Sequence, residues 1–228
     1  MRYSKVVEGK FLFRPNRFIA KVLVNGVEET VHVKNTGRCK ELLVEGARVY
    51  LFESDNPNRK TKYDLIAVEK VTDRGTILVN MDSQVPNDVV AEWLPKSKLF
   101  SANAVIKREV KFGKSRFDFY VEDEDRKAFI EVKGVTLEND GIVSFPDAPT
   151  ERGVKHINEL TSCLENGFEA YIIFVVQMKG VLKFRPNSEH HKEFADTLNS
   201  AREKGVKVLV YDCLVTPDSI VIDEKIEY

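Results

Sequence analysis

The sequence is poor in cysteine and contains no long apolar run. Its three cysteines, Cys39, Cys163 and Cys213, lie far apart and form no Cys-x-x-Cys pair, which argues against a zinc site and against a disulfide framework. The most apolar stretch, residues 170–176, is far shorter than the roughly 20 residues of a membrane-spanning helix. The N-terminal residues also lack the apolar segment of a secretory signal. We therefore expect a cytoplasmic protein that has no membrane partner.

A strong net charge is also missing. The formal net charge is −1 at pH 7, so the chain as a whole lacks the basic balance typical of nucleic-acid-binding proteins. Residues 1–62, however, contain 13 Lys and Arg against 7 Asp and Glu, whereas residues 63–228 contain 22 against 29. This asymmetry indicates a polyanionic partner for the basic N-terminal part, although surface charge without a function explains it equally well.

The first part of the chain has the pattern of short strands and turns. Residues 18–24 and 27–33 flank Asn25-Gly26, a dipeptide that favours a tight hairpin because both turn positions need a positive φ. Further predicted elements are a short helix over 38–43 and strands over 47–52, 63–71 and 76–80. The pattern predicts a small barrel of the OB type over residues 1–82, with an SH3-like barrel as the alternative.

From residue 83 onward, helices alternate with strands. The predicted elements are helices over 87–99, 150–167 and 190–204, and strands over 104–112, 116–121, 128–136, 170–177, 206–210 and 219–223. Early hairpins followed by βαβ connections predict a mixed sheet with helices on both faces. The predicted fold class is therefore α+β, with an OB-like barrel over residues 1–82 and a mixed-sheet α/β domain over residues 83–228.

One Asp/Glu-x-Lys pattern differs from the others in the chain. The pattern occurs five times, beginning at Glu8, Glu109, Asp125, Glu131 and Asp223. Glu131 follows a run of apolar residues at the start of a predicted strand. Twelve residues separate it from Asp118, a separation that suits facing positions on the two strands of a hairpin. Lys133 comes two residues after Glu131, so both side chains project from one face of a strand.

These three residues suit phosphodiester hydrolysis. Two carboxylates, Asp118 and Glu131, can hold a hard divalent ion, Mg²⁺ or Mn²⁺, which keeps positions open for water and a phosphate oxygen. The ion polarises the phosphate and lowers the pKa of its bound water, while Lys133 orients that water and stabilises negative charge. The alternative is a solvent-facing stripe on an edge strand. We predict Asp118 and Glu131 as metal ligands and Asp118, Glu131 and Lys133 as catalytic residues.

Further motifs extend along the chain in a defined order. They are Arg14-Pro15-Asn16-Arg17-Phe18, Asn35-Thr36-Gly37-Arg38, Ser115-Arg116-Phe117-Asp118, Glu131-Val132-Lys133, the segment from Phe145 to Thr150, Arg152-Gly153, Lys155-His156 and Phe174-Val175-Val176-Gln177. With these motifs the chain resembles the sugar fermentation stimulation protein family over nearly its full length. Its second part resembles the PD-(D/E)xK, restriction-endonuclease-like superfamily.

The resemblance implies an OB-like N-terminal domain, a restriction-endonuclease-like C-terminal domain and DNA binding, with a regulatory role in sugar (maltose) metabolism. It does not imply that members cleave nucleic acid. We therefore keep three hypotheses: a metal-dependent nuclease that acts on DNA, a non-catalytic DNA-binding transcriptional regulator, and an RNA-processing factor. The oligomeric state is open, with a homodimer as one option.

The predicted nucleic-acid contacts lie in both parts of the chain. Arg14, Arg17, Asn35 and Arg38 fall at predicted strand ends or turns, where an OB barrel presents its ligand face. The resemblance adds Arg116 and strengthens a cationic helical face made of Arg152, Lys155 and His156, which share the spacing i, i+3, i+4. Gln177 completes the set as a donor to phosphate or base, with a structural amide as the equal alternative.

Three further residues have open roles. Asp147 lies in a proline-rich loop and is either an additional acid near the metal or a turn residue. Phe18 could stack on a base, as could Phe13, but we interpret Phe18 as a core residue.

Overall fold

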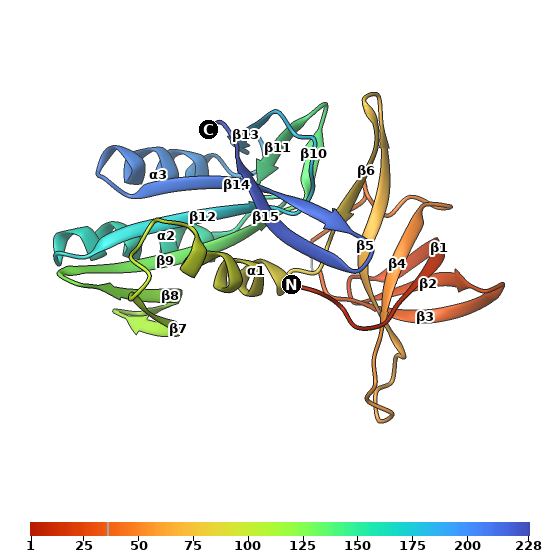
Figure 1. Ribbon diagram of the computed structural model, residues 1–228. Coiled ribbons are helices and arrows are strands. Elements are labelled where there is room, and N and C mark those ends of the chain that lie inside the picture. The colour runs from red at the N-terminus through yellow and green to blue at the C-terminus, as the bar shows by residue number, and fades with distance from the viewer. Residues whose placement is uncertain (36) are drawn as a thin grey trace.

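The computed structural model describes residues 1–35 and 37–228. The chain forms two lobes, with the N-terminal strands in one and the remaining strands and all three α-helices in the other (Figure 1). Within the residues described, no helix combines the length and the apolar character needed to span a bilayer.

The N-terminal lobe is a closed barrel. Its strands are β1 (Val6–Asn16), β2 (Ile19–Val24), β3 (Val27–Val33), β4 (Arg48–Glu53), β5 (Tyr63–Thr72) and β6 (Gly75–Asn80). They pair in the order β3-β2-β1-β4-β5-β6, and an additional parallel pairing of β3 with β5 closes the sheet on itself. Closure leaves fewer unpaired strand edges, and the predicted barrel is confirmed.

The barrel strands follow the alternation of the sequence. In β2, Ala20, Val22 and Val24 point into the core, while the residues between them are half-buried. Asn25 and Gly26 have φ values of 50° and 81°, as the tight hairpin between β2 and β3 requires.

Two expectations for the barrel are wrong. Residues 38–43 form turns rather than a helix, and Cys39 has a φ of 46°, which breaks helical geometry. Phe18 is 45% exposed because it lies in the β1–β2 turn and not on the inward face of a strand. Its ring stacks under the Arg17 guanidinium, with Cζ 4.8 Å from the ring centroid.

The second lobe contains a six-stranded mixed sheet. Its strands are β7 (Val105–Phe112), β8 (Ser115–Asp123), β9 (Arg126–Val135), β12 (Glu169–Val176), β14 (Lys207–Thr216) and β15 (Ser219–Lys225). The order is β15-β14-β12-β9-β8-β7. The central strands β9, β12 and β14 are parallel, and hairpins add antiparallel strands at both edges. The predicted mixed sheet is confirmed.

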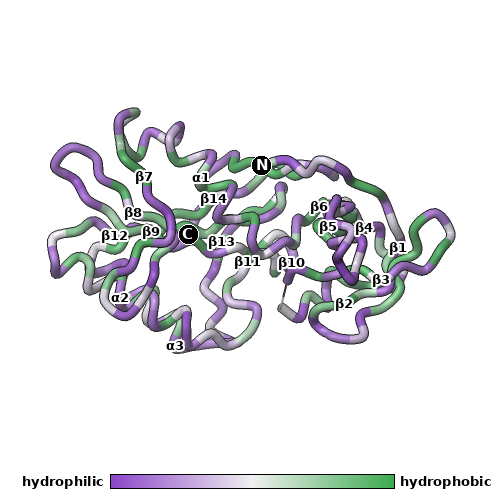
Figure 2. Tube along the Cα trace, turned by 90° about the horizontal axis from the view of Figure 1, so that it is seen from below, coloured by the Kyte–Doolittle hydropathy of each residue, from purple (hydrophilic) through white to green (hydrophobic). Residues whose placement is uncertain are grey.

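Helices cover both faces of this sheet. The helices are α1 (Val85–Trp93), followed by a 3₁₀ turn (Leu94–Lys96), α2 (Glu151–Glu165) and α3 (Lys192–Glu203). Helices α2 and α3 lie on one side of the sheet and α1 on the other, as the view in Figure 2 shows. Val154 and Leu160 of α2 pack with Phe129 of β9, whereas Val89 of α1 packs with Val132 on the opposite face.

A third, small sheet was not expected from the sequence. It consists of β10 (Leu137–Asn139), β11 (Ile142–Phe145) and β13 (Lys183–Pro186), paired in the order β10-β11-β13. These strands of three or four residues are too short to show a clear alternation. They lie beside the end of β9 that faces the barrel (Figure 1).

Polar contacts join the two lobes. Gln177 follows β12, and its Nε2 donates to Asn80 Oδ1 and to the carbonyl of Asp82, both at 3.0 Å. The backbone N–H of Asn80 donates to the carbonyl of Gln177 at 2.9 Å. Because Gln177 and Asn80 are each 1% exposed, these hydrogen bonds replace lost contacts with water and fix the end of β12 against the barrel.

Candidate functional site

The position of Asp118 follows from the point at which β8 and β9 separate. Their regular pairing ends at Phe119 and Ile130. Asp118 lies next to the last paired residue, between the separating strands, and its Oδ2 accepts a hydrogen bond from the backbone N–H of Val132 at 2.7 Å. The first acid is therefore hydrogen-bonded to the strand that carries the second.

Asn87 of α1 supports Asp118 from the other side. Its Nδ2 donates to Asp118 Oδ1 at 2.8 Å. The sequence interpretation placed the start of a helix at residue 87 and did not expect this contact. Helix α1 instead begins at Val85, with Pro86 in its first turn, a place where proline is favoured.

Glu131 is the most enclosed member of the site, with 3% of its surface exposed. His156 Nδ1 lies 2.6 Å from its Oε1, and Lys133 Nζ is also hydrogen-bonded to Oε1. The other oxygen, Oε2, is buried and has no hydrogen-bond partner among the residues described. A buried carboxylate oxygen without a partner is costly, so this atom is a candidate ligand for a cation.

The two acids differ in their electrostatics. Burial, and after it the negative charge of Glu131, raises the pKa of Asp118 above its ordinary value. Burial acts in the same direction on Glu131, but hydrogen bonds and positive charge from His156 and Lys133 outweigh it and lower the pKa of that carboxyl. The structure thus brings Asp118, Glu131 and Lys133 together, with His156 beside them.

Helix α2 delivers His156 to the site. Thr150 precedes the helix and caps it, because its Oγ1 accepts the N–H of Gly153 at 3.1 Å, a standard N-terminal cap. His156 lies on the buried side of the helix and is 5% exposed, while Arg152 and Lys155 are exposed. The three residues therefore do not form one solvated cationic face. Arg152 stays close to the histidine, with Nε 3.4 Å from Nε2.

The predicted contacts in the barrel have different surroundings. Arg14 donates from its two terminal nitrogens to four backbone carbonyls, those of Arg17, Asn35, Gly37 and Arg38, and so shapes the loop after β3. Arg17 and Arg38 are exposed. Asn35 is half-buried and donates to the carbonyl of Met81 at 3.0 Å. A role of Arg14 or Asn35 in binding stays a prediction.

Two predicted contacts remain in the second lobe. The Arg116 side chain is 67% exposed and lies on the strand that carries Asp118, with Glu109 4.0 Å away. Gln177 is buried, and both protons of its amide nitrogen are used at the junction of the lobes, which favours the structural alternative for that nitrogen. Thr36, which belongs to one of the motifs, lies outside the described residues.

A second acidic group was missed by the sequence interpretation. Asp212, Asp223 and Glu224 have carboxylate oxygens within 4.8 Å of one another. Lys179 Nζ lies 2.9, 2.6 and 2.7 Å from these three carboxylates respectively. This one ammonium group offsets only part of the charge of the three carboxylates, as Lys133 does at Glu131. The two sites differ in burial, because Asp223 and Glu224 are exposed, whereas Glu131 is buried and has an oxygen without a partner among the residues described.

Comparison with known families covers both lobes. Residues 12–80 match a family model described as the SfsA N-terminal OB domain. Residues 84–219 match one described as the sugar fermentation stimulation protein RE domain. The match of residues 12–80 identifies the barrel as the OB type and not the SH3-like alternative.

Individual relatives are similar to this chain over its full length. A sugar fermentation stimulation protein homolog of Clostridium beijerinckii is 57% identical over 100% of this chain and 99% of its own length. The homolog of Ruminiclostridium cellulolyticum is 55% identical over the same shares. The solved structure of Pyrococcus furiosus SfsA in complex with Ca²⁺ superposes with a TM-score of 0.87 at 27% identity, over 100% of this chain and 97% of that one. The chain therefore belongs to the sugar fermentation stimulation protein family.

Proposed function

We propose that this protein binds DNA and hydrolyses phosphodiester bonds at a divalent-metal site formed by Asp118 and Glu131. The observation that carries this proposal is the buried, unpartnered Oε2 of Glu131, next to a second carboxylate whose pKa is raised. Two neighbouring carboxylates in a poorly solvated site repel each other, and a bound cation relieves that repulsion.

The residues fit a hard cation. Glu131 offers a free oxygen, and each Asp118 oxygen that accepts one hydrogen bond keeps a second lone pair. Mg²⁺ and Mn²⁺ prefer such carboxylate ligands and bind through one or two of them together with water and phosphate oxygens. The Pyrococcus furiosus relative was solved in complex with Ca²⁺, which supports divalent-ion binding within the family.

Each side chain then has a defined task. The bound ion would supply Lewis-acid activation of the phosphate and of a water molecule. Lys133, with 18% of its side chain exposed, would hold the attacking water and stabilise negative charge that develops on the phosphate. His156 would hold Glu131 in place through Oε1 and leave Oε2 for the cation.

The barrel supplies a surface for the nucleic acid. Phe13 and Phe18 are 53% and 45% exposed, and the Arg17 guanidinium lies over the Phe18 ring. Exposed aromatics next to arginine are typical of surfaces that stack the bases of single strands. Single-stranded DNA, or RNA, is therefore the class of ligand that we expect this lobe to prefer.

One experiment tests the activity. Purified protein is incubated with single- and double-stranded DNA and RNA in Mg²⁺, Mn²⁺ or EDTA, and compared with Lys133→Ala and with Lys127→Ala. Lys127 is an exposed lysine on the same strand and serves as the control. Cleavage by the wild type and by Lys127→Ala, but not by Lys133→Ala or in EDTA, supports the proposal. Equal cleavage by all three proteins indicates a contaminating nuclease.

A regulatory role is the second candidate. The family name links the relatives to the stimulation of sugar fermentation, and a DNA-binding protein without cleavage would satisfy that link. Specific binding of DNA by wild type and Lys133→Ala alike, with no cleavage by either in any metal, would favour this candidate.

A further inference from the structure

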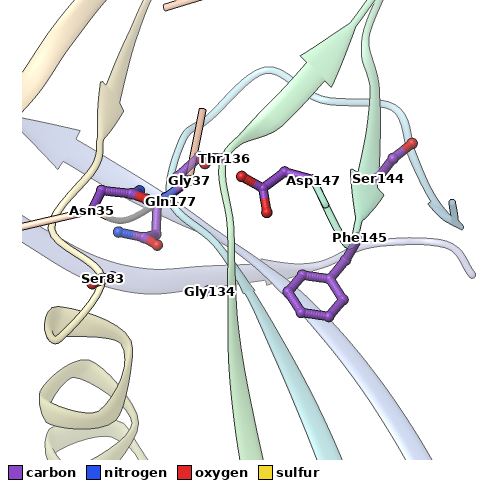
Figure 3. A pocket seen from close by; sticks show the side chains of 9 residues that line it. All are labelled: Asn35, Gly37, Ser83, Gly134, Thr136, Ser144, Phe145, Asp147 and Gln177. Atoms are coloured by element: carbon purple, nitrogen blue, oxygen red, sulfur yellow. Dashed lines mark hydrogen bonds between the residues drawn. The ribbon is translucent and has the colours of Figure 1, made fainter. Parts of the chain in front are cut away.

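A polar pocket lies between the two lobes, beside the strand that carries the candidate catalytic residues. Its lining residues are Asn35, Gly37, Ser83, Gly134, Thr136, Ser144, Phe145, Asp147 and Gln177 (Figure 3). Gly134 directly follows Lys133, and consecutive Cα atoms are only ~3.8 Å apart. The pocket therefore begins one residue beyond the proposed catalytic lysine.

The size of the pocket limits its occupant. Its volume is about 170 Å³, which is several times the ~30 Å³ share of one water molecule. It is below the ~300–1,000 Å³ of sites for drug-sized ligands. The space suits a single ring system rather than a whole nucleotide or a disaccharide.

Two glycines leave room for polar side chains that line the pocket. A Cβ at Gly37 would lie 2.2 Å from Asp147 Oδ2, and a Cβ at Gly134 would lie 2.5 Å from Gln177 Oε1. Neither glycine is among those with a positive φ. The requirement at these two positions is thus for space beside a polar side chain and not for an unusual backbone conformation.

Two free groups of the pocket are hydrogen-bond acceptors. Within residues 1–35 and 37–228, the carboxylate of Asp147 accepts no hydrogen bond, and neither does Oε1 of Gln177. Figure 3 shows the Asp147 carboxylate directed into the pocket, toward Gly37 and Gln177. An occupant bound at these two groups must present N–H or O–H donors, because two acceptors form no hydrogen bond with each other.

We infer that this pocket receives one unstacked nucleobase of the bound strand, and that Asp147 selects guanine. This inference rests on the proposed binding of nucleic acid. Guanine presents two adjacent donors, N1–H and N2–H, which match the two oxygens of one carboxylate. Single-stranded nucleic acid is read by such contacts to the Watson–Crick edges of splayed bases, and the pocket lies at the junction between the barrel and the strand that carries Lys133.

The test uses the full chain in EDTA, so that binding is measured without cleavage. Fluorescence anisotropy gives the affinity for thymine oligonucleotides that carry one central guanine, adenine or abasic position. We expect the guanine oligonucleotide to bind about tenfold more tightly than the abasic one, within the range of a bidentate contact to a base. Asp147→Asn should reduce this preference to less than about twofold, because an amide offers only one acceptor.

The matched control is Asp140→Asn. Asp140 is exposed in the turn between β10 and β11 with a φ of 51°, a conformation that asparagine tolerates, and this variant should keep the full preference. Gly37→Ala is a second test, because its Cβ would meet Asp147. It should also abolish the preference, and thermal unfolding confirms that each variant is folded.

The outcomes separate the two proposals. If the wild type binds no oligonucleotide, the proposed function fails and the pocket inference fails with it. If it binds all oligonucleotides equally, the proposed binding of nucleic acid stands and the pocket inference is wrong. A monosaccharide such as glucose that stabilises the wild type but not Asp147→Asn, without any base preference, would also overturn the inference and assign the pocket to a small sugar.

Discussion

His156 Nδ1 and Glu131 Oε1 lie 2.6 Å apart in the buried part of the site. The contact joins helix α2 to strand β9, two elements that the chain separates by β10 and β11 of the small sheet. It fixes the orientation of the carboxylate and leaves the opposite oxygen without a partner among the residues described. The imidazole is itself held edge-on to Phe117, with ring centroids 6.1 Å apart.

Removal of this contact is expected to affect both stability and metal affinity. His156→Ala should destabilise the protein by ~1–3 kcal/mol because a buried acceptor loses a partner, seen as a Tm lower by ~2–4 °C per kcal/mol. Mn²⁺ affinity, measured by calorimetry, should fall by ~10–100-fold, as for other groups that orient a metal ligand. His190→Ala removes an exposed histidine and should change neither quantity.

Substitution of Lys133 should distinguish a role in catalysis from a role in DNA binding. Lys133→Ala should lower the cleavage rate by ~10²–10⁴, the contribution of a positioned acid–base group, while DNA affinity stays within a few-fold because other cations remain. Lys133→Arg should also lose cleavage activity, since a guanidinium is larger and does not give up its proton near neutral pH. Paired gel-shift and cleavage assays measure both effects, and a parallel loss of binding and cleavage would contradict the assignment.

Asp118→Asn tests the metal site. The variant should lose most of the stabilisation by Mn²⁺, which for the wild type is ~2.7 kcal/mol at a concentration of 100 times Kd. Without metal it should be slightly more stable than the wild type, because the repulsion from Glu131 is gone. Asn87 can rotate its amide and keep a hydrogen bond to the new side chain. Thermal unfolding with and without Mn²⁺ gives both numbers, and a Mn²⁺-induced shift equal to that of the wild type would exclude Asp118 as a ligand.

The raised pKa of Asp118 also predicts a pH dependence in metal-free protein. A carboxyl whose folded pKa lies above its ordinary value of 3.8 favours the folded state at lower pH, and this contribution is lost as the pH rises through the folded pKa. The stability advantage of Asp118→Asn over the wild type should therefore grow as the pH rises above ~3.8. Glu131, whose pKa is lowered, has the opposite dependence in both proteins, so urea unfolding of the pair largely isolates Asp118. A constant difference between them across pH would refute the prediction.

Two arginines of one motif should behave differently. Arg14→Ala removes donors to four carbonyls and should lower the unfolding free energy by at least ~2 kcal/mol, because hydrogen bonds of charged groups contribute ~1.5–3 kcal/mol. Arg17→Ala, at an exposed position, should leave Tm unchanged. It should instead weaken single-strand binding and reduce the slope of log K against log salt by about 0.7. Thermal unfolding and salt titrations measure the pair, each variant serving as the control for the other.

The α-helices and most strands of both lobes could be predicted because their patterns are local, whereas β1 and the three strands of the small sheet were not expected. The Asn25-Gly26 hairpin, the two-residue spacing of Glu131 and Lys133, and the Thr150 cap of α2 each depend on residues close in sequence. The turn at Cys39 could not be predicted in this way. Cys39 follows Gly37 and Arg38, whose carbonyls accept hydrogen bonds from Arg14. Arg14 lies on β1, far from this turn in the sequence.

The sequence by itself indicated a small barrel, a mixed sheet and the proximity of Asp118 to Glu131, because alternation and a hairpin separation are enough to predict them. Only the tertiary structure decided which neighbours complete the site. Asn87 reaches Asp118 from a helix on one face of the sheet, and His156 reaches Glu131 from a helix on the other. Such contacts depend on how helices pack across a sheet, and no spacing along the chain encodes that packing. Tertiary packing likewise brings Asp147 and Gln177 into one pocket between the lobes.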